Sequence, residues 1–120
     1  MSCVFCQIPS AAYIAENESF YAIADKRPVV QGHILIVSKR HFEDMFAMRP
    51  EEAAALQELL VRVKEWLIER YAPDGYNLGM NCGEHAGQTV FHYHLHVIPR
   101  YKADRLHGMR GLREYIREIV

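Results

Sequence analysis

Three histidines alternate with three large apolar residues late in this chain, and no other feature constrains the fold as strongly. The alternating residues are His92, Tyr93, His94, Leu95, His96 and Val97. In a strand, side chains two residues apart share a face, whereas a helix would place His94 far from the other two histidines. The pattern therefore predicts a strand from Val90 to Ile98, ending at Pro99, with three imidazoles on one face.

A row of imidazoles has uses that no other side chain shares. Imidazole is close to half-protonated at neutral pH, so it can serve as nucleophile, acid, donor to phosphate oxygens or metal ligand. Two other interpretations are a metal-binding or tag-like tract and a half-exposed strand with histidines by chance. A tag would not alternate with large apolar residues, so we expect the row to be functional.

The remainder of the chain predicts more strands and one long helix. Residue types typical of strands occupy 19–24 and 33–37, and further strands are expected at 13–16 and 75–81. A helix is predicted from Pro50 to about Tyr71, with apolar residues at helical spacing: Leu56, Leu59, Leu60, Val63 and Leu67. The tail from Tyr101 is expected to be irregular and then helical from about Leu112. This order of elements predicts an α+β fold, in which one long helix packs on an antiparallel sheet of about five strands.

Length and composition limit the class of protein. With 120 residues, 50% of them hydrophobic, the chain is expected to form one domain over 1–120, with a core of about 3–100 and a tail of about 101–120. A net charge of −1 argues against a basic surface for nucleic acid. The first residues lack a signal-peptide pattern, and the longest aliphatic run, 34–37, is too short to span a membrane. Three cysteines suit a reducing compartment, so we expect a soluble cytoplasmic protein.

The histidine strand resembles the signature of the histidine-triad (HIT) family of nucleotide hydrolases and transferases, His-φ-His-φ-His-φ-φ with φ apolar. Residues 92–98 match it in full. The loop 81–90 is similar to the family's Asn/Gln-x-Gly…Gly-Gln-Ser/Thr-Val segment, and 25–41 resembles its nucleotide-binding half. The resemblance extends from about Cys3 to Arg100. It implies the HIT fold, a purine nucleotide substrate and a homodimer, for which the long helix with Trp66 and Tyr71 is a candidate surface.

The same resemblance implies roles for single residues. His94 is expected to attack the α-phosphorus and form a nucleotidyl-histidine intermediate, which water then cleaves. His96 is expected to donate to the phosphate oxygens, and His33 to lie near the phosphate and leaving group. Thr89 and Gln88 are expected to contact the phosphate chain, and Asp25 to bind the ribose hydroxyls. Asn81 is expected to orient the substrate, and Ile23 to lie beside the base. Asp25 as a turn residue only, and Asn81 as a loop cap only, stay open as alternatives.

The pair Cys3 and Cys6 predicts a metal site. Cys-x-x-Cys is weak evidence alone, but a thioredoxin-like motif should follow a strand, and residue 3 leaves no room for one. Zinc-binding, bacterial-type members of the resembled family complete the site with two histidines, which here fall on His41 and His92. Four filled ligand positions imply a structural zinc. The alternative is two small buried cysteines and a surface His41, with His92 hydrogen-bonding beside the nucleophile.

Within the family, the segments Gly-Gln-Thr-Val (87–90) and Val-Ile-Pro-Arg (97–100) resemble the dinucleoside-polyphosphate branch. We therefore expect hydrolysis of a substrate such as diadenosine tetraphosphate (Ap4A) with release of AMP. Mg²⁺ is a candidate companion of that substrate. The alternatives are an adenosine phosphoramidate hydrolase, a nucleotidyl transferase and a nucleotide-sensing binding protein with little turnover.

Overall fold

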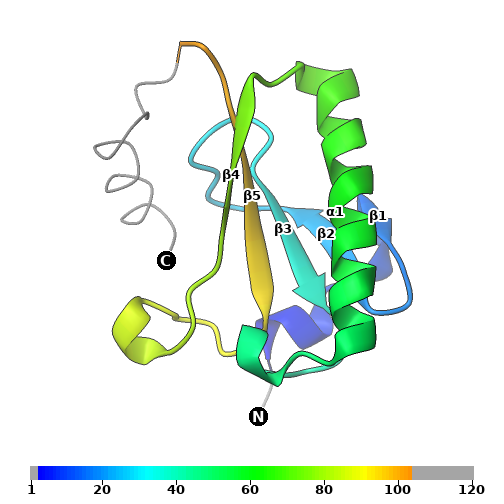
Figure 1. The fold of residues 1–120 in the computed structure, drawn as a ribbon, viewed down its shortest axis with the longest axis vertical. Helices are drawn as coiled ribbons and strands as arrows, with labels where there is room; N and C mark the ends of the chain where they lie inside the picture. Colours follow the sequence, from blue (N-terminus) through cyan, green and yellow to red (C-terminus); the bar gives the residue numbers. More distant parts are fainter. Residues whose placement is uncertain (1–2, 104–120) are drawn as a thin grey trace.

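A computed structural model describes residues 3–103, which form one five-stranded antiparallel sheet and one long helix (Figure 1). The strands are β1 (Ala15–Glu16), β2 (Phe20–Ala24), β3 (Ile34–Ser38), β4 (Gly75–Gly79) and β5 (His94–Arg100). They lie in the order β1-β2-β3-β5-β4, and every neighbouring pair is antiparallel. Helix α1 (Pro50–Tyr71) connects β3 to β4. The predicted fold class, α+β with one helix on an antiparallel sheet, is confirmed.

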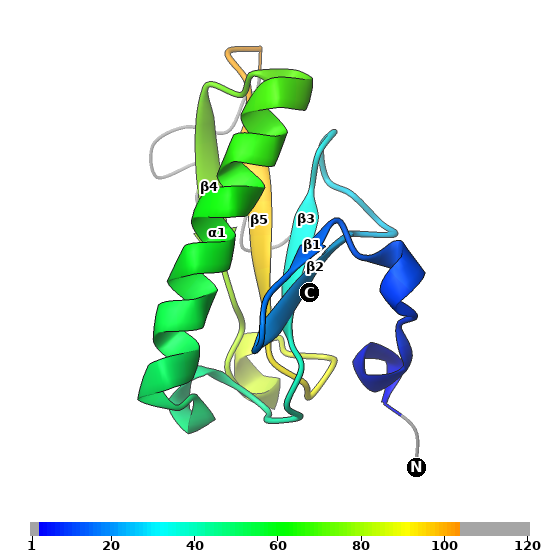
Figure 2. The same ribbon diagram turned by 90° about the vertical axis from the view of Figure 1, so that its right-hand side faces the viewer.

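The two faces of the sheet have different covers. Figure 2 shows α1 on one side and the N-terminal segment on the other. Alternate residues of β2, β3 and β5 point towards α1, whose Leu59, Val63 and Leu67 are fully buried against them. On the opposite face, Phe5, Ile8 and Tyr13 pack on buried residues of β2 and β3: Tyr21, Ile23, Leu35 and Val37. Residues 34–37 are therefore buried on both faces of the sheet.

The start of α1 is fixed by Glu52. Its carboxylate accepts the backbone N–H of the capping residue Arg49 at 2.8 Å, as the glutamate of a capping box does. Two guanidinium nitrogens of Arg40 donate to the same carboxylate, each at 2.8 Å. This ion pair ties the loop after β3 to the helix. The helix ends at Tyr71, as predicted. The next residue, Ala72, adopts a left-handed conformation with a φ of 47°, and Pro73 follows it.

The predicted bounds of the histidine strand are wrong at both ends. Strand β5 begins at His94 rather than Val90, because the N–H of Tyr93 donates to the carbonyl of Phe42 in the loop after β3. It continues through Pro99. At Pro99 strand β5 extends past Ile34, the first residue of β3, and so pairs with β4 alone. His92 thus precedes the strand.

Other differences between prediction and structure are small. The strand predicted over 13–16 is reduced to Ala15–Glu16, and the strand predicted over 75–81 ends at Gly79. The helix expected from about Leu112 lies outside the described residues. Within 3–103, no helix is both long enough and apolar enough to cross a membrane.

Candidate functional site

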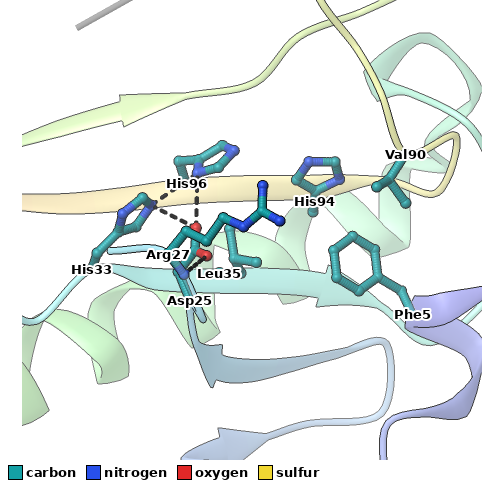
Figure 3. A pocket seen from close by; sticks show the side chains of 8 residues that line it. All are labelled: Phe5, Asp25, Arg27, His33, Leu35, Val90, His94 and His96. Carbon is teal, nitrogen blue, oxygen red and sulfur yellow. Dashed lines mark hydrogen bonds and ion pairs between the residues drawn. The ribbon is translucent and has the colours of Figure 1, made fainter. Parts of the chain in front are cut away.

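Three histidines meet on the sheet face opposite α1 (Figure 3). His94 and His96 come from β5, and His33 stands one residue before β3. The ring centroids lie 5.4 Å apart for His94 and His96, and 5.1 Å apart for His33 and His96. Antiparallel pairing of β3 with β5 produces this cluster from residues that are distant in sequence.

The hydrogen bond of His94 fixes its tautomer. Its Nδ1 lies 2.8 Å from the carbonyl oxygen of His92, which can only accept, so Nδ1 carries the proton. The lone pair of the neutral ring is then on Nε2. Burial lowers the pKa of His94 and so favours the neutral ring. The ring of Phe5 packs at 5.0 Å between centroids and limits its movement.

His33 and His96 form a hydrogen-bonded chain. The N–H of Val29 donates to Nδ1 of His33 at 3.2 Å, so neutral His33 carries its proton on Nε2. That Nε2 lies 2.9 Å from Nδ1 of His96 and 3.3 Å from Oδ2 of Asp25. His96 thus accepts on Nδ1 and carries its own proton on Nε2. This Nε2 is buried and has no hydrogen-bond partner within 3–103. Burial, followed by the neighbouring His33 and His94, lowers the pKa of His96 to about 4.

Two imidazoles and one carboxylate are also a common metal-binding set, and the ligand atoms of Asp25, His33 and His96 lie within 4.8 Å of one another. The bond from Val29 argues against a metal here. It leaves the proton of His33 on Nε2, the atom that would have to bind the metal. The arrangement therefore suits a chain of hydrogen bonds.

Two adjoining cavities open beside these histidines. The smaller, of about 250 Å³, is lined by His33, His94 and His96 together with five further residues: Phe5, Asp25, Arg27, Leu35 and Val90. Those five also line the larger cavity of about 520 Å³, whose other walls include Val4, Ile8 and Ile23. A mainly apolar cavity beside one that three histidines line fits a ligand with an apolar planar part and an anionic part.

Asp25 already uses both carboxylate oxygens. Oδ1 accepts the backbone N–H of Arg27 at 2.9 Å and closes a turn, while Oδ2 faces His33 at 3.3 Å and His96 at 3.8 Å. Asp25 is thus a turn residue and also a wall of both cavities. Its contact with ribose stays a prediction.

The loop before β5 is held by Gln88. The buried amide of Gln88 accepts from the N–H of Gly83 at 2.7 Å and donates to the carbonyls of Glu43 at 2.7 Å and Val90 at 3.1 Å. Gln88 therefore shapes the loop, and phosphate would have to compete with backbone for its amide. Thr89 is exposed and Asn81 is half-buried, and their contacts with substrate stay predictions.

A second cluster joins Cys3, Cys6, His41 and His92. Nδ1 of His92 lies 3.4 Å from Sγ of Cys3, 3.5 Å from Sγ of Cys6 and 3.1 Å from Nδ1 of His41. Nδ1 of His41 in turn lies 3.2 Å from Sγ of Cys6. A tetrahedral zinc with ordinary bond lengths places two nitrogens about 3.3 Å apart, and nitrogen and sulfur about 3.5 Å apart. Nε2 of His92 contacts the carbonyl of Ser38 at 2.7 Å, which leaves the lone pair on Nδ1. The cluster therefore fits zinc, and both cysteines are free thiols.

Comparison with known proteins places this geometry in a family. The model of the HIT domain matches residues 7–103. The chain belongs to the HIT family. The match includes Asp25, His33, His41 and the histidines of 92–96, whereas Cys3 and Cys6 precede it.

Individual HIT proteins resemble the chain over most of its length. The protein named Protein hit of Bacillus subtilis is 37% identical over 105 residues, covering 83% of this chain and 72% of that protein. Adenylylsulfatase HINT3 of Arabidopsis thaliana is 32% identical over 117 residues, covering 94% of this chain and 59% of that protein. The crystal structure of a zinc-bound histidine triad family protein from Mycobacterium smegmatis is 37% identical, with a TM-score of 0.78 and coverage of 98% of this chain and 94% of that one.

Four residues that line the smaller cavity were not among the site residues expected from the sequence: Phe5, Arg27, Leu35 and Val90. Phe5 packs on His94. Its position between Cys3 and Cys6 is the sequence feature that could have pointed to it. Arg27 lines both cavities, but in the sequence it stands in a charged turn before a proline, which is typical of solvated loops.

Proposed function

We propose that this HIT protein hydrolyses adenine-type nucleotides at the α-phosphate, with His94 as the nucleophile. The observation that carries the proposal is the bond from Nδ1 of His94 to the carbonyl of His92, because it leaves the lone pair on Nε2 of a ring that lines the cavity. Nε2 attacks the α-phosphorus as the bond to the leaving group breaks, and the leaving group takes that electron pair. Water then cleaves the phosphorus–nitrogen bond, which releases AMP and restores His94.

The neighbouring groups suit the charge that this reaction develops. His96 directs a buried N–H, without a partner within 3–103, at a site where phosphate oxygens become more negative. His33 holds His96 in the required tautomer. The modified ring of His94 gains positive charge, and the carboxylate of Asp25 is near enough to favour it electrostatically. Ile23 lines the larger cavity, where we expect the base to bind.

The leaving group defines the substrate class, and we favour a phosphoanhydride such as Ap4A. Adenylylsulfatase HINT3, a relative of this chain, is named for an adenylyl compound with an anionic leaving group, so adenylyl sulfate is a second candidate. A phosphoramidate substrate, nucleotidyl transfer and nucleotide sensing remain as outcomes of the test. Mg²⁺ as a companion of the substrate, and a cytoplasmic location, stay predictions.

We also propose that Cys3, Cys6, His41 and His92 hold a structural zinc. Their four donor atoms fit a closed tetrahedral site, which would tie the N-terminal segment to the start of β5. His92 links this site to the reaction, because its carbonyl accepts the proton of His94.

The experiment is a substrate comparison with a variant as control. Purified protein is mixed with Ap4A, adenylyl sulfate or an adenosine phosphoramidate, and AMP is followed by chromatography. His94→Ala should abolish release while its circular dichroism spectrum stays that of the folded protein. If no substrate gives AMP although nucleotide binds, the hydrolase proposal fails and sensing or transfer replaces it.

A further inference from the structure

The smaller cavity has an uneven distribution of charge. The polar groups that line it are three imidazoles, the Asp25 carboxylate and the guanidinium of Arg27. Among the described lining residues, Arg27 is therefore the only permanent cation. A polyphosphate brings several negative charges, and the guanidinium of Arg27 stays positively charged at any physiological pH.

The backbone of Arg27 is fixed while its side chain is available. Asp25 accepts its N–H at 2.9 Å, and the following Pro28 restricts its backbone to extended conformations. The guanidinium is exposed and makes no ion pair or hydrogen bond with residues of 3–103. In Figure 3 it extends towards the space between His96 and His94. Five donors that have no partner among the described residues thus face the site of the expected reaction.

A second donor at the same cavity also has no partner within residues 3–103. The Nε2–H of His96 is buried, and the His96 side chain is only 8% exposed. A buried donor without a partner is costly, so it indicates a ligand with acceptor oxygens. If the α-phosphate lies between His94 and His96, Arg27 is left for the charges beyond it.

We propose that Arg27 is a specificity-determining residue that binds the anionic leaving group of the substrate. The inference rests on the proposed function and deepens it, because it selects phosphoanhydrides over phosphoramidates with an uncharged amine leaving group. The guanidinium matches the oxygens of phosphate or sulfate, and it stabilises the charge that collects on the leaving oxygen when the bond breaks.

Arg27→Gln tests this proposal, with Lys26→Gln as the matched control. Lys26 is the adjacent cation of the same turn, and it lines the larger cavity only. With Ap4A, Arg27→Gln should lower kcat/KM by about 10- to 100-fold, the usual effect of losing a charge-assisted bond. With an N-alkyl adenosine phosphoramidate it should change kcat/KM by less than about threefold, because no leaving-group charge is lost. Arg27→Lys should recover part of the Ap4A activity, and Lys26→Gln should affect both substrates alike and weakly.

Equal losses on both substrates would overturn the assignment, because they would place Arg27 at the α-phosphate or nucleoside. No loss on either would overturn it as well. If the wild-type protein releases no AMP, the proposed function fails, and the assignment is then tested by calorimetric binding of Ap4A against AMP. Arg27→Gln must weaken Ap4A binding selectively, and an equal effect on AMP contradicts the proposal.

Discussion

At the residue scale, two backbone groups set the chemistry of the site. The carbonyl of His92 fixes the proton of His94, and the N–H of Val29 fixes that of His33. Neither contact depends on the identity of the side chain that supplies it, so neither is visible in the sequence. The histidine alternation predicted His94 and the family resemblance predicted His33, whereas their tautomers required the fold.

The role of His33 can be tested with one variant that removes its hydrogen bonds to Val29 and His96 and one that keeps them. His33→Leu leaves Nδ1 of buried His96 without a donor, which should cost about 1–3 kcal/mol of unfolding free energy and lower kcat by at least tenfold. His33→Gln keeps an acceptor for Val29 and a donor for His96, so it should recover most of the loss. Urea unfolding and AMP release measure both effects, and equal behaviour of the two variants would contradict the chain of hydrogen bonds.

At the element scale, the loop after β3 links the helix to the metal cluster. Arg40 on this loop is bound by Glu52 of α1, and His41 follows directly. The helix and its apolar spacing were predictable from local sequence alone. The true start of β5 was not, because it depends on Phe42 of this loop accepting the N–H of Tyr93. Arg27 was missed for the same reason: only the sheet brings its turn beside the histidines.

The pair of Arg40 and Glu52 predicts a stability that depends on pH. The hydrogen bonds from Arg40, and secondarily the N–H of Arg49, lower the pKa of Glu52 from 4.5 to about 2 despite its burial. A lowered folded-state pKa stabilises the fold above the unfolded value and loses that contribution as pH falls through the folded value. As the pH falls from about 4.5 to 2, the free energy of unfolding of the wild type should therefore decrease by about 2 kcal/mol more than that of Glu52→Gln. Urea unfolding across this range measures it, with Glu51→Gln as an exposed control expected to follow the wild type.

The proposed zinc site joins the N-terminal segment to the start of β5, and removal of the metal should loosen one wall of the cavities. Chelation should lower the thermal midpoint by about 10 °C, since a ligand that binds only the folded state stabilises it. Cys6→Ser should reproduce this effect with loss of zinc from the metal analysis. Cys82→Ser changes a cysteine outside the cluster and should keep both zinc and midpoint. Full zinc content in Cys6→Ser would contradict the assigned ligands.

At the scale of the whole molecule, the sheet ends in an uncovered edge. Strand β4 pairs with β5 on one side and has no other neighbour within 3–103. Exposed apolar residues gather nearby on β4 and α1, where Leu78 is 49% exposed and Val61 46%. Both line an apolar hollow of about 250 Å³ with Leu60 and Tyr76. Edge strands and apolar patches of this kind favour pairing with another chain.

We therefore predict a homodimer that buries β4 and the adjoining face of α1. We predict this surface near Leu78. The helix surface with Trp66 and Tyr71 stays a second prediction, and the centroids of these two half-buried rings lie 6.4 Å apart. Leu78→Arg should shift the mass measured by light scattering from two chains towards one, because a buried guanidinium without a partner opposes association. Phe46→Arg is the matched control, since Phe46 is 87% exposed and lies outside this hollow. A wild-type mass of one chain, or a dimer that survives Leu78→Arg but not Phe46→Arg, would move the interface elsewhere. Retained AMP release by the monomeric variant would further indicate that each chain holds a complete site.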